Sequence, residues 1–182
     1  MSFLPSWVLE SMTREDLIRY IEILSKNFLT IDGYWFLGVE EKFGIEAAID
    51  LDRRAWEQYA VSEAKRIKEL LGIAEGTLAD LERALQLICF APSSGVRIEL
   101  LDGRLVMTIT KCRPQRARTR DGRGEFACKP VGFAHLSTFA KTINPRFETR
   151  CIFAPPDSHP DGLWCRWEFS LKEDAEAGGR NA

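Results

Sequence analysis

The 182-residue sequence lacks the long apolar runs and the excess of one charge that mark several protein classes. No apolar run approaches the roughly 18 residues that a helix needs to cross a bilayer, so we expect no membrane partner. The 25 Lys and Arg against 27 Asp and Glu leave a formal net charge of −2, which argues against a generally basic nucleic-acid binder. No basic stretch followed by an apolar core begins the sequence, so we expect a cytoplasmic protein without a secretory signal.

Several catalytic fingerprints are also missing. Only two histidines occur, His135 and His159, so a His-rich catalytic metal site is excluded. The sequence has no Gly-rich phosphate loop, no serine-hydrolase elbow and no kinase-like set of motifs. None of the five cysteines forms a C-x2-C pair, so the zinc-ribbon signature is absent too.

The first ninety or so residues have the apolar spacing of helices. Asp32-Gly33 predicts a break or a new helix cap, followed by a short apolar helix over 34–43 that Gly44 stops. Residues 45–71 contain no Gly or Pro and predict one long helix that ends at Gly72. Two pairs resemble capping boxes, Thr13 with Asp16 and Thr77 with Asp80. Apolar residues follow the first of these caps at helical spacing: Leu17, Ile18, Ile21, Leu24 and Phe28.

Beyond the loop-like segment 92–95 the period changes to that of strands. Asp102-Gly103 between two alternating segments predicts a β-hairpin. Residues 131–143 return to helical spacing, and two more strands are expected over 147–153 and 163–171. The sequence therefore predicts an α+β fold, an N-terminal helical layer packed on a C-terminal, mostly antiparallel sheet. We expect one domain over 1–171, with a helical half (1–91), a sheet half (95–171) and a flexible tail (172–182).

The five cysteines are unevenly placed. Cys89 lies in the apolar stretch 85–90 and is most simply a buried core thiol. The other four lie in the C-terminal half beside turn residues at the edges of short segments, where thiolates can converge. On spacing alone, a four-thiolate metal site and unconnected thiols are both open. These four are Cys112, Cys128, Cys151 and Cys165.

Several motifs together resemble one family. It is an uncharacterised prokaryotic family of cytosolic proteins related to L-2-amino-thiazoline-4-carboxylic acid hydrolases, and the order of elements is similar, more distantly, to the 4-vinyl-reductase small-molecule-binding domain. The motifs in the C-terminal half are Cys112-Arg113-Pro114-Gln115-x-Ala117-Arg118, Phe126-x-Cys128-Lys129-Pro130-Val131, Cys151-x3-Pro155-Pro156-Asp157 and Trp164-Cys165-x-Trp167-Glu168-Phe169. Those in the N-terminal half are Asp32-Gly33-x-Trp35-Phe36-x3-Glu40 and Asp52-x3-Trp56.

The resemblance implies a ligand pocket between the helical layer and the sheet. It also favours the cysteine cluster, because all four of the family's cysteine positions are filled here. Zinc is the expected metal for a tetrahedral thiolate site, with iron or an iron–sulfur cluster as the alternative. If all four thiolates bind one zinc the site is closed and structural, whereas three would leave a position for water or a ligand.

Glu40 is the first catalytic candidate, because it follows the apolar residues 35–39 on a helix too apolar to lie at the surface all round. Burial would raise the pKa of its carboxyl and suit it to act as a general base or metal ligand. The alternative is that Glu40 points to solvent or pairs with an arginine. Asp52, one turn before Trp56, could approach Glu40 if the two helices pack antiparallel, although a solvated face is the simpler interpretation.

His135 and Arg118 complete the polar candidates. His135 could act as a base, or with Cys128 as a nucleophilic pair, and a partly exposed helix histidine is the alternative. Arg118 lies in the basic segment 113–124 and could hold a substrate carboxylate, while a mobile solvated loop is the simpler interpretation of that segment. Alternation in the last strand puts Cys165, Trp167 and Phe169 on one face. The aromatic residues expected to contact substrate are Trp35 and Trp167.

Two functions follow as hypotheses. The first is a hydrolase of cyclic C–N bonds that binds a small polar carboxylate of the thiazoline type, with Glu40 and His135 as catalytic groups. The second is a non-enzymatic ligand-binding or sensor domain with a structural zinc site, and a third, simpler interpretation leaves the cysteines as free core thiols. The expected partners are a small-molecule ligand and, as one candidate assembly, a second copy of the chain in a homodimer.

Overall fold

The computed structural model describes residues 7–172, so the predicted tail lies outside the described residues except for Lys172. Helices occupy the first half of the chain and a four-stranded sheet the second, which confirms the predicted α+β fold. None of the helices in the described part of the chain has the length and apolar character needed to cross a membrane. The helices are α1 (Trp7–Ser11), α2 (Arg14–Phe43), α3 (Ile45–Leu70), α4 (Leu78–Leu85), α5 (Ala91–Ser94), α6 (Arg113–Arg120) and α7 (Lys129–Ile143).

Helix α2 is one continuous helix of 30 residues, so the predicted break at Asp32-Gly33 is wrong. Asp32 does not cap a helix, because its carboxylate accepts a hydrogen bond from Trp56 Nε1 of α3 at 3.2 Å. A glycine inside a helix costs about 1 kcal/mol, which this tertiary contact and the packing of α2 outweigh. Gly44, with φ of 89°, then makes the sharp turn into α3. Both predicted capping boxes are present, at Thr13 and at Thr77.

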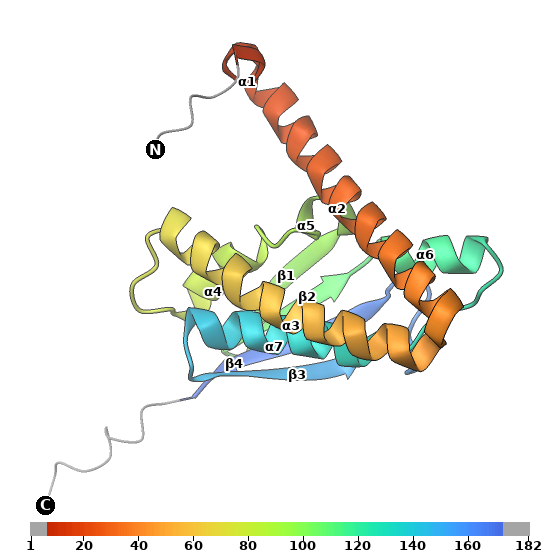
Figure 1. The fold of residues 1–182 in the computed structure, drawn as a ribbon. Coiled ribbons are helices and arrows are strands. Elements are labelled where there is room, and N and C mark those ends of the chain that lie inside the picture. Colours follow the sequence, from red (N-terminus) through yellow and green to blue (C-terminus); the bar gives the residue numbers. More distant parts are fainter. Residues whose placement is uncertain (1–6, 173–182) are drawn as a thin grey trace, which may run out of the picture.

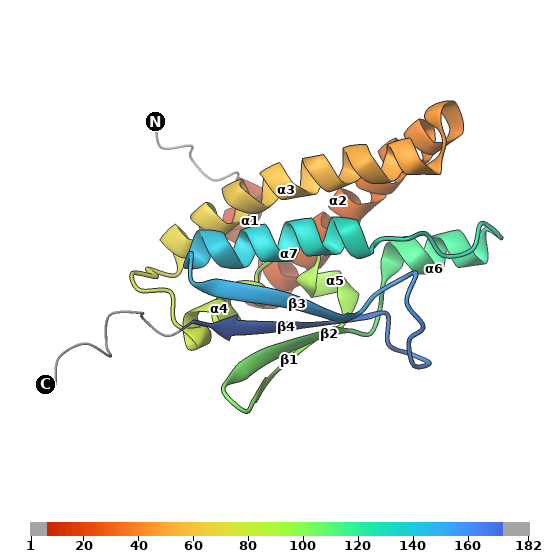
Figure 2. The same ribbon diagram turned by 90° about the horizontal axis from the view of Figure 1, so that it is seen from below.

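The sheet has the strand order β1-β2-β4-β3 and is antiparallel throughout. The predicted hairpin is confirmed, because Asp102 and Gly103 both have positive φ and join β1 to β2 with Leu101 opposite Arg104. Figure 2 shows that the helices cover one face of the sheet and leave the other face open. The strands are β1 (Val96–Leu101), β2 (Arg104–Ile109), β3 (Phe147–Phe153) and β4 (Cys165–Leu171).

Helix α7 lies directly on the covered face of the sheet, and α3 runs beside α7 further out (Figure 2). The approach of α7 to β4 is close at Gly132, where an added Cβ would lie 2.9 Å from Trp167 Cζ2. Trp167 and Phe169 alternate inward from β4 as predicted and are buried. The main core joins α3, α4, α7 and the sheet through fully buried side chains, among them Ala60, Leu85, Leu105, Phe139 and Phe169.

The basic segment after β2 is not a solvated loop, which corrects the simpler interpretation of its sequence. Residues 113–120 form α6, which lies beside the C-terminal half of α2 (Figure 1). Its anchor is Gln115, a fully buried side chain whose amide donates to the carbonyl of Phe126 at 2.8 Å and accepts from its N–H at 3.1 Å. Because both polar ends of this amide are satisfied, α6 can pack against the body despite its charge.

Candidate functional site

A cavity of about 480 Å³ lies where α2, α3, α6, α7 and the sheet meet. Its exposed wall is predominantly apolar, and polar side chains from α2, α3, α5, α6 and α7 reach it. A cavity of this size and character is typical of a small-molecule site. The polar and ionisable residues of the wall are Thr30, Asp32, Tyr34, Asp52, Ser94, Cys112, Arg113, Arg118, Arg120, Asp121, Arg123, Cys128, His135 and Cys165.

Two carboxyl groups meet in this wall, Asp32 from the middle of α2 and Asp52 from the second turn of α3. The turn at Gly44 makes α2 and α3 neighbouring antiparallel helices. Asp32 and Asp52, which are twenty positions apart in the sequence, therefore lie close together. The side chains of Asp32 and Asp52 are hydrogen-bonded to each other, and Trp56 Nε1 donates to Asp32 Oδ1 at 3.2 Å. Asp52 therefore approaches Asp32 and not Glu40.

The pair holds a proton at neutral pH. Burial raises the pKa of Asp32 to about 6, against the lowering effect of the hydrogen bond from Trp56. Burial together with the neighbouring charge of Asp32 raises the pKa of Asp52 to about 8. Two carboxyl groups at hydrogen-bond distance cannot both ionise cheaply, so one proton is shared. The larger rise is that of the Asp52 pKa, so Asp52 is the member of the pair that we expect to hold the proton near pH 7.

A buried histidine forms a second polar unit in the wall of the cavity. His135 is 2% exposed, and its Nε2 lies 2.8 Å from Glu63 Oε2. Glu63 also accepts hydrogen bonds from the Tyr59 hydroxyl at 3.1 Å and from the backbone N–H of Cys89. Because three donors hold this carboxylate, it fixes the orientation of the imidazole. The expectation of a partly exposed helix histidine is wrong.

Arg118 and Glu40 form an ion pair between α6 and α2. The guanidinium donates two hydrogen bonds to the carboxylate, and the longer, from Nη2 to Oε1, is 3.1 Å. Hydrogen bonding to Arg118 lowers the pKa of Glu40, so the raised pKa predicted for a buried, unpaired Glu40 is wrong. Arg118 is 9% exposed and lies against the rings of Phe36 and Phe126. Its Nε is buried without a hydrogen-bond partner among the described residues.

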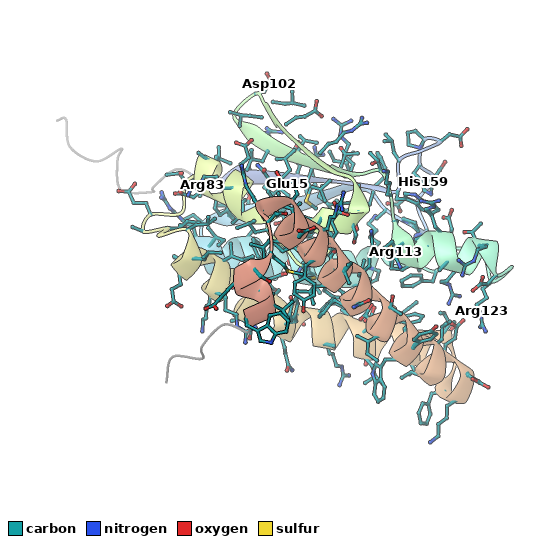
Figure 3. The ribbon with its side chains drawn as sticks, turned by 90° about the horizontal axis from the view of Figure 1, so that it is seen from above. Glu15, Arg83, Asp102, Arg113, Arg123 and His159 are labelled. Atoms are coloured by element: carbon teal, nitrogen blue, oxygen red, sulfur yellow. The ribbon has the colours of Figure 1, made fainter. Side chains whose placement is uncertain are left out.

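Two further arginines lie at the solvent side of the cavity. Arg113 and Arg123 both line it, and both are exposed to solvent. Figure 3 shows them at opposite ends of α6, Arg113 where the helix begins and Arg123 beyond its end. Within residues 7–172, neither forms an ion pair within 4.0 Å with a carboxylate. Both guanidinium groups are exposed at the rim, and the charge of Arg123 also helps to lower the pKa values of the carboxyls of Glu40 and Asp121.

The four predicted metal ligands are gathered near the cavity. Cys112, Cys128 and Cys165 line it, and Cys151 lies close enough to Cys128 and Cys165 to affect the pKa values of their thiols. Burial raises the pKa of Cys112 to about 12 and that of Cys128 to about 11, so both are neutral thiols at pH 7. Among residues 7–172, however, no three His, Cys, Asp or Glu side chains are arranged as ligands of one metal ion. The side-chain arrangement does not fit zinc or an iron–sulfur cluster, and the four-cysteine site stays a prediction.

The remaining predicted site residues differ in whether they line the cavity. Trp167 lines the cavity and is 2% exposed, whereas Trp35 is 74% exposed on α2 and does not line it. Trp35 is thus separated from the site because it lies on the side of α2 that faces solvent. His135 and Cys128 line the same cavity, one at the second turn and one at the start of α7.

Sequence reasoning missed Asp32 and Glu63 as site residues. The sequence predicted a helix break or cap at Asp32, because Asp-Gly is common at turns and caps. The sequence did contain an indication of this role. Asp32 lies between Leu29 and Phe36 on the buried face of the helix, where a polar side chain needs a hydrogen-bond partner from a neighbouring helix. Glu63 had the same signal, because Ala60, Ala64 and Ile67 mark the buried face of α3 on which it lies.

Comparison with known proteins places the chain in a family. No curated protein matches the sequence. A family model described as a family of unknown function, DUF6125, matches residues 10–171, which include every element from α2 to β4. The matched range also includes both members of the carboxyl pair and all four cysteines. The chain therefore belongs to the DUF6125 family.

Proposed function

We propose that the protein binds a small organic acid in the cavity and that the Asp32–Asp52 pair performs acid–base chemistry on it. The observation that carries this proposal is the close pair of carboxyl groups in the wall of a largely apolar cavity, where burial raises both pKa values. Groups whose pKa values lie near the working pH are the most effective proton donors and acceptors. A purely structural role would favour an apolar pair at this point, because burying two carboxyl groups costs stability.

The arginines suggest the class of ligand. Arg113 and Arg123 present exposed guanidinium groups at the rim, and a guanidinium binds a carboxylate or phosphate in bidentate fashion. The aromatic and aliphatic wall behind them suits the less polar body of the ligand. A small carboxylate would thus enter with its anionic end at the rim and its reactive part near the carboxyl pair.

Hydrolysis of a cyclic carbon–nitrogen double bond is the reaction that we assign to the pair. The oxygen of a water molecule bonds to the ring carbon, and one proton of that water passes to the Asp32 carboxylate. The ring nitrogen takes the proton of the Asp52 carboxyl. When the C–N bond then breaks, the hydroxyl proton passes to the Asp52 carboxylate and the proton held by Asp32 passes to the leaving nitrogen, which gives a carbonyl group and an amine. The pair holds one proton before and after the addition step, so no outside acid or base is needed.

The thiazoline carboxylate implied by the sequence resemblance is the first substrate to test. The purified chain would be incubated with 2-amino-thiazoline-4-carboxylate and with ring analogues, and ring opening would be followed by proton NMR. Turnover by the native protein should fall at least about 100-fold in Asp52→Asn and Asp32→Asn. Asp50→Asn is the matched control, because Asp50 lies on the same helix but pairs with Arg53 and Arg54 at the surface.

A non-enzymatic ligand-binding domain is the competing function. The apolar wall favours it, since a sensor needs the cavity but not the proton. Saturable binding by calorimetry without ring opening would replace the enzyme with the sensor, and the absence of both binding and turnover across the panel would contradict the proposal. A cytoplasmic location belongs to the same proposal, and cell fractionation tests it.

A further inference from the structure

The N-terminal half of α2, with α1 in front of it, forms an arm that projects from the body (Figure 1). Nine large apolar side chains between residues 7 and 24 are 37–79% exposed on this arm. Together they present on the order of 1,000 Å² of apolar surface, whereas the largest apolar patch on a typical monomer is about 300–600 Å². These side chains are Trp7, Val8, Leu9, Leu17, Ile18, Tyr20, Ile21, Ile23 and Leu24.

One face of α2 carries a regular seam of exposed residues. Its positions are separated by three and four residues in alternation, the spacing at which two helices pack side by side along their length. The seam continues from the arm into the middle of α2, on the side away from α7. Tyr34 ends its apolar part, and at Gly38 an added Cβ would touch nothing within 4 Å. The seam residues are Leu17, Tyr20, Leu24, Asn27, Ile31, Tyr34 and Gly38, all exposed.

The printed sequence contains no other segment suited to cover this seam. Residues 173–182 include no Leu, Ile, Val, Met or aromatic residue, so they offer no apolar face. Residues 1–6 are too few to cover a helix face that runs from Leu17 to Gly38. Neither of these two segments can therefore cover the seam.

The charges of the arm favour a protein over a lipid surface. Helices that lie on membranes carry an excess of Lys and Arg on their polar face. Between residues 12 and 27 the arm has three basic and three acidic residues, and the net charge is zero. A single polar residue in an apolar seam, here Asn27, is a feature by which paired helices fix their register.

We infer that the α2 seam pairs with the same seam of a second copy of this chain. A stable interface needs about 800 Å² from each partner, and the arm with the seam supplies that area. A seam with this spacing can pack on a copy of itself in a two-fold pair, which covers the seam residues of both copies. Tyr34 belongs to both the seam and the cavity wall, whereas the other seam residues do not line the cavity. Pairing along the seam therefore does not depend on the proposed function.

Sedimentation equilibrium of the full chain tests the pairing. The native protein should sediment at twice the 20.7 kDa chain mass at micromolar concentration. The double variant Leu24→Glu/Ile31→Glu should sediment as a monomer, with the dissociation constant raised at least about 100-fold. The control Leu70→Glu/Leu100→Glu changes two residues that are 76% and 61% exposed away from the seam, and it should remain a dimer.

Far-UV circular dichroism checks that each variant keeps its helices. If the seam variant loses its fold, Asn27→Leu serves instead, and it should tighten the dimer by about tenfold because it makes the seam wholly apolar. A native protein that is monomeric at about 100 µM would overturn the inference. So would a seam variant that stays dimeric, a control that dissociates, or a monomer that binds phosphatidylcholine–phosphatidylserine vesicles through the arm.

Discussion

The carboxyl pair makes a prediction of unusual sign, namely that removing one of its acidic groups stabilises the protein. The change is Asp52→Asn, which keeps the size of the side chain and a hydrogen-bond donor toward Asp32. Burial and the charge of Asp32 raise the pKa of Asp52 from 3.8 to about 8. The folded state therefore binds a proton that the unfolded chain releases above about pH 4. The stabilisation from this group is complete below pH 4 and is lost as pH rises toward 8.

The size of this stability change follows from the difference between pH 7 and the pKa of Asp52 in the unfolded chain. About three pH units separate them, and each unit corresponds to about 1.4 kcal/mol, so the cost at pH 7 is at most about 4 kcal/mol. Residual contact with solvent and relaxation of the site reduce this figure, and we expect Asp52→Asn to raise the free energy of unfolding by about 2 kcal/mol at pH 7. At about pH 4 the native protein and the variant should be equally stable.

Urea unfolding followed by circular dichroism at several pH values between about 4 and 8 measures this difference. Asp50→Asn is the control of opposite sign, because the pKa of the exposed Asp50 is lowered by its hydrogen bonds from Arg53 and Arg54 despite some desolvation. That variant should gain no stability at any pH. The reasoning is refuted if Asp52→Asn is no more stable than the native protein at pH 7, or if its advantage does not grow with pH.

Three further predictions concern other parts of the site. Glu40→Gln should lower the free energy of unfolding by about 1–3 kcal/mol at pH 7, because it leaves the buried Arg118 with a weaker acceptor. Since hydrogen bonding to Arg118 lowers the pKa of Glu40, this loss should shrink as pH falls below about 4 in urea unfolding, and a loss independent of pH would contradict the ion pair. Gly132→Ala should cost about 1–3 kcal/mol and change the tryptophan fluorescence, because its Cβ would press on Trp167, and an unchanged melting temperature would disprove that close contact. All five cysteines should react slowly with iodoacetamide at pH 7 until the chain unfolds, because burial raises the pKa of every thiol, and fast labelling of the folded protein would show that the thiols are accessible.

Local patterns predicted the elements whose cause is local. The capping boxes at Thr13 and Thr77 form because hydroxyl and carboxylate groups three residues apart satisfy the first free N–H groups of a helix. The hairpin at Asp102-Gly103 and the inward alternation of β4 follow from turn and strand geometry in the same way. These features depend on neighbours within a few residues, which the sequence displays directly.

The features that the sequence could not predict depend on partners far along the chain. Asp32 reads as a turn residue until the Trp56 indole, 24 positions later, is seen to bind it. The arginine-rich segment was interpreted as a solvated loop. It forms α6 and packs against the body because the Gln115 side chain hydrogen-bonds to the backbone of Phe126. The apolar residues that begin at Leu17 have the spacing of a helix, but this spacing does not show what their side chains contact, and the structure leaves Leu17, Ile18, Ile21 and Leu24 exposed. In each case the pattern shows which residue needs a partner but not where that partner lies.

The shared proton of Asp32 and Asp52 is the feature on which the proposed chemistry depends, and carboxyl NMR measures it most directly. Native protein labelled with carbon-13 at the aspartate carboxyl carbons would be titrated from about pH 4 to about pH 9, alongside Asp52→Asn. We predict one aspartate that titrates near pH 8 and a second near pH 6, with the upper titration absent from the variant. If every aspartate is ionised by about pH 5, the pair holds no proton at neutral pH and the acid–base function is contradicted.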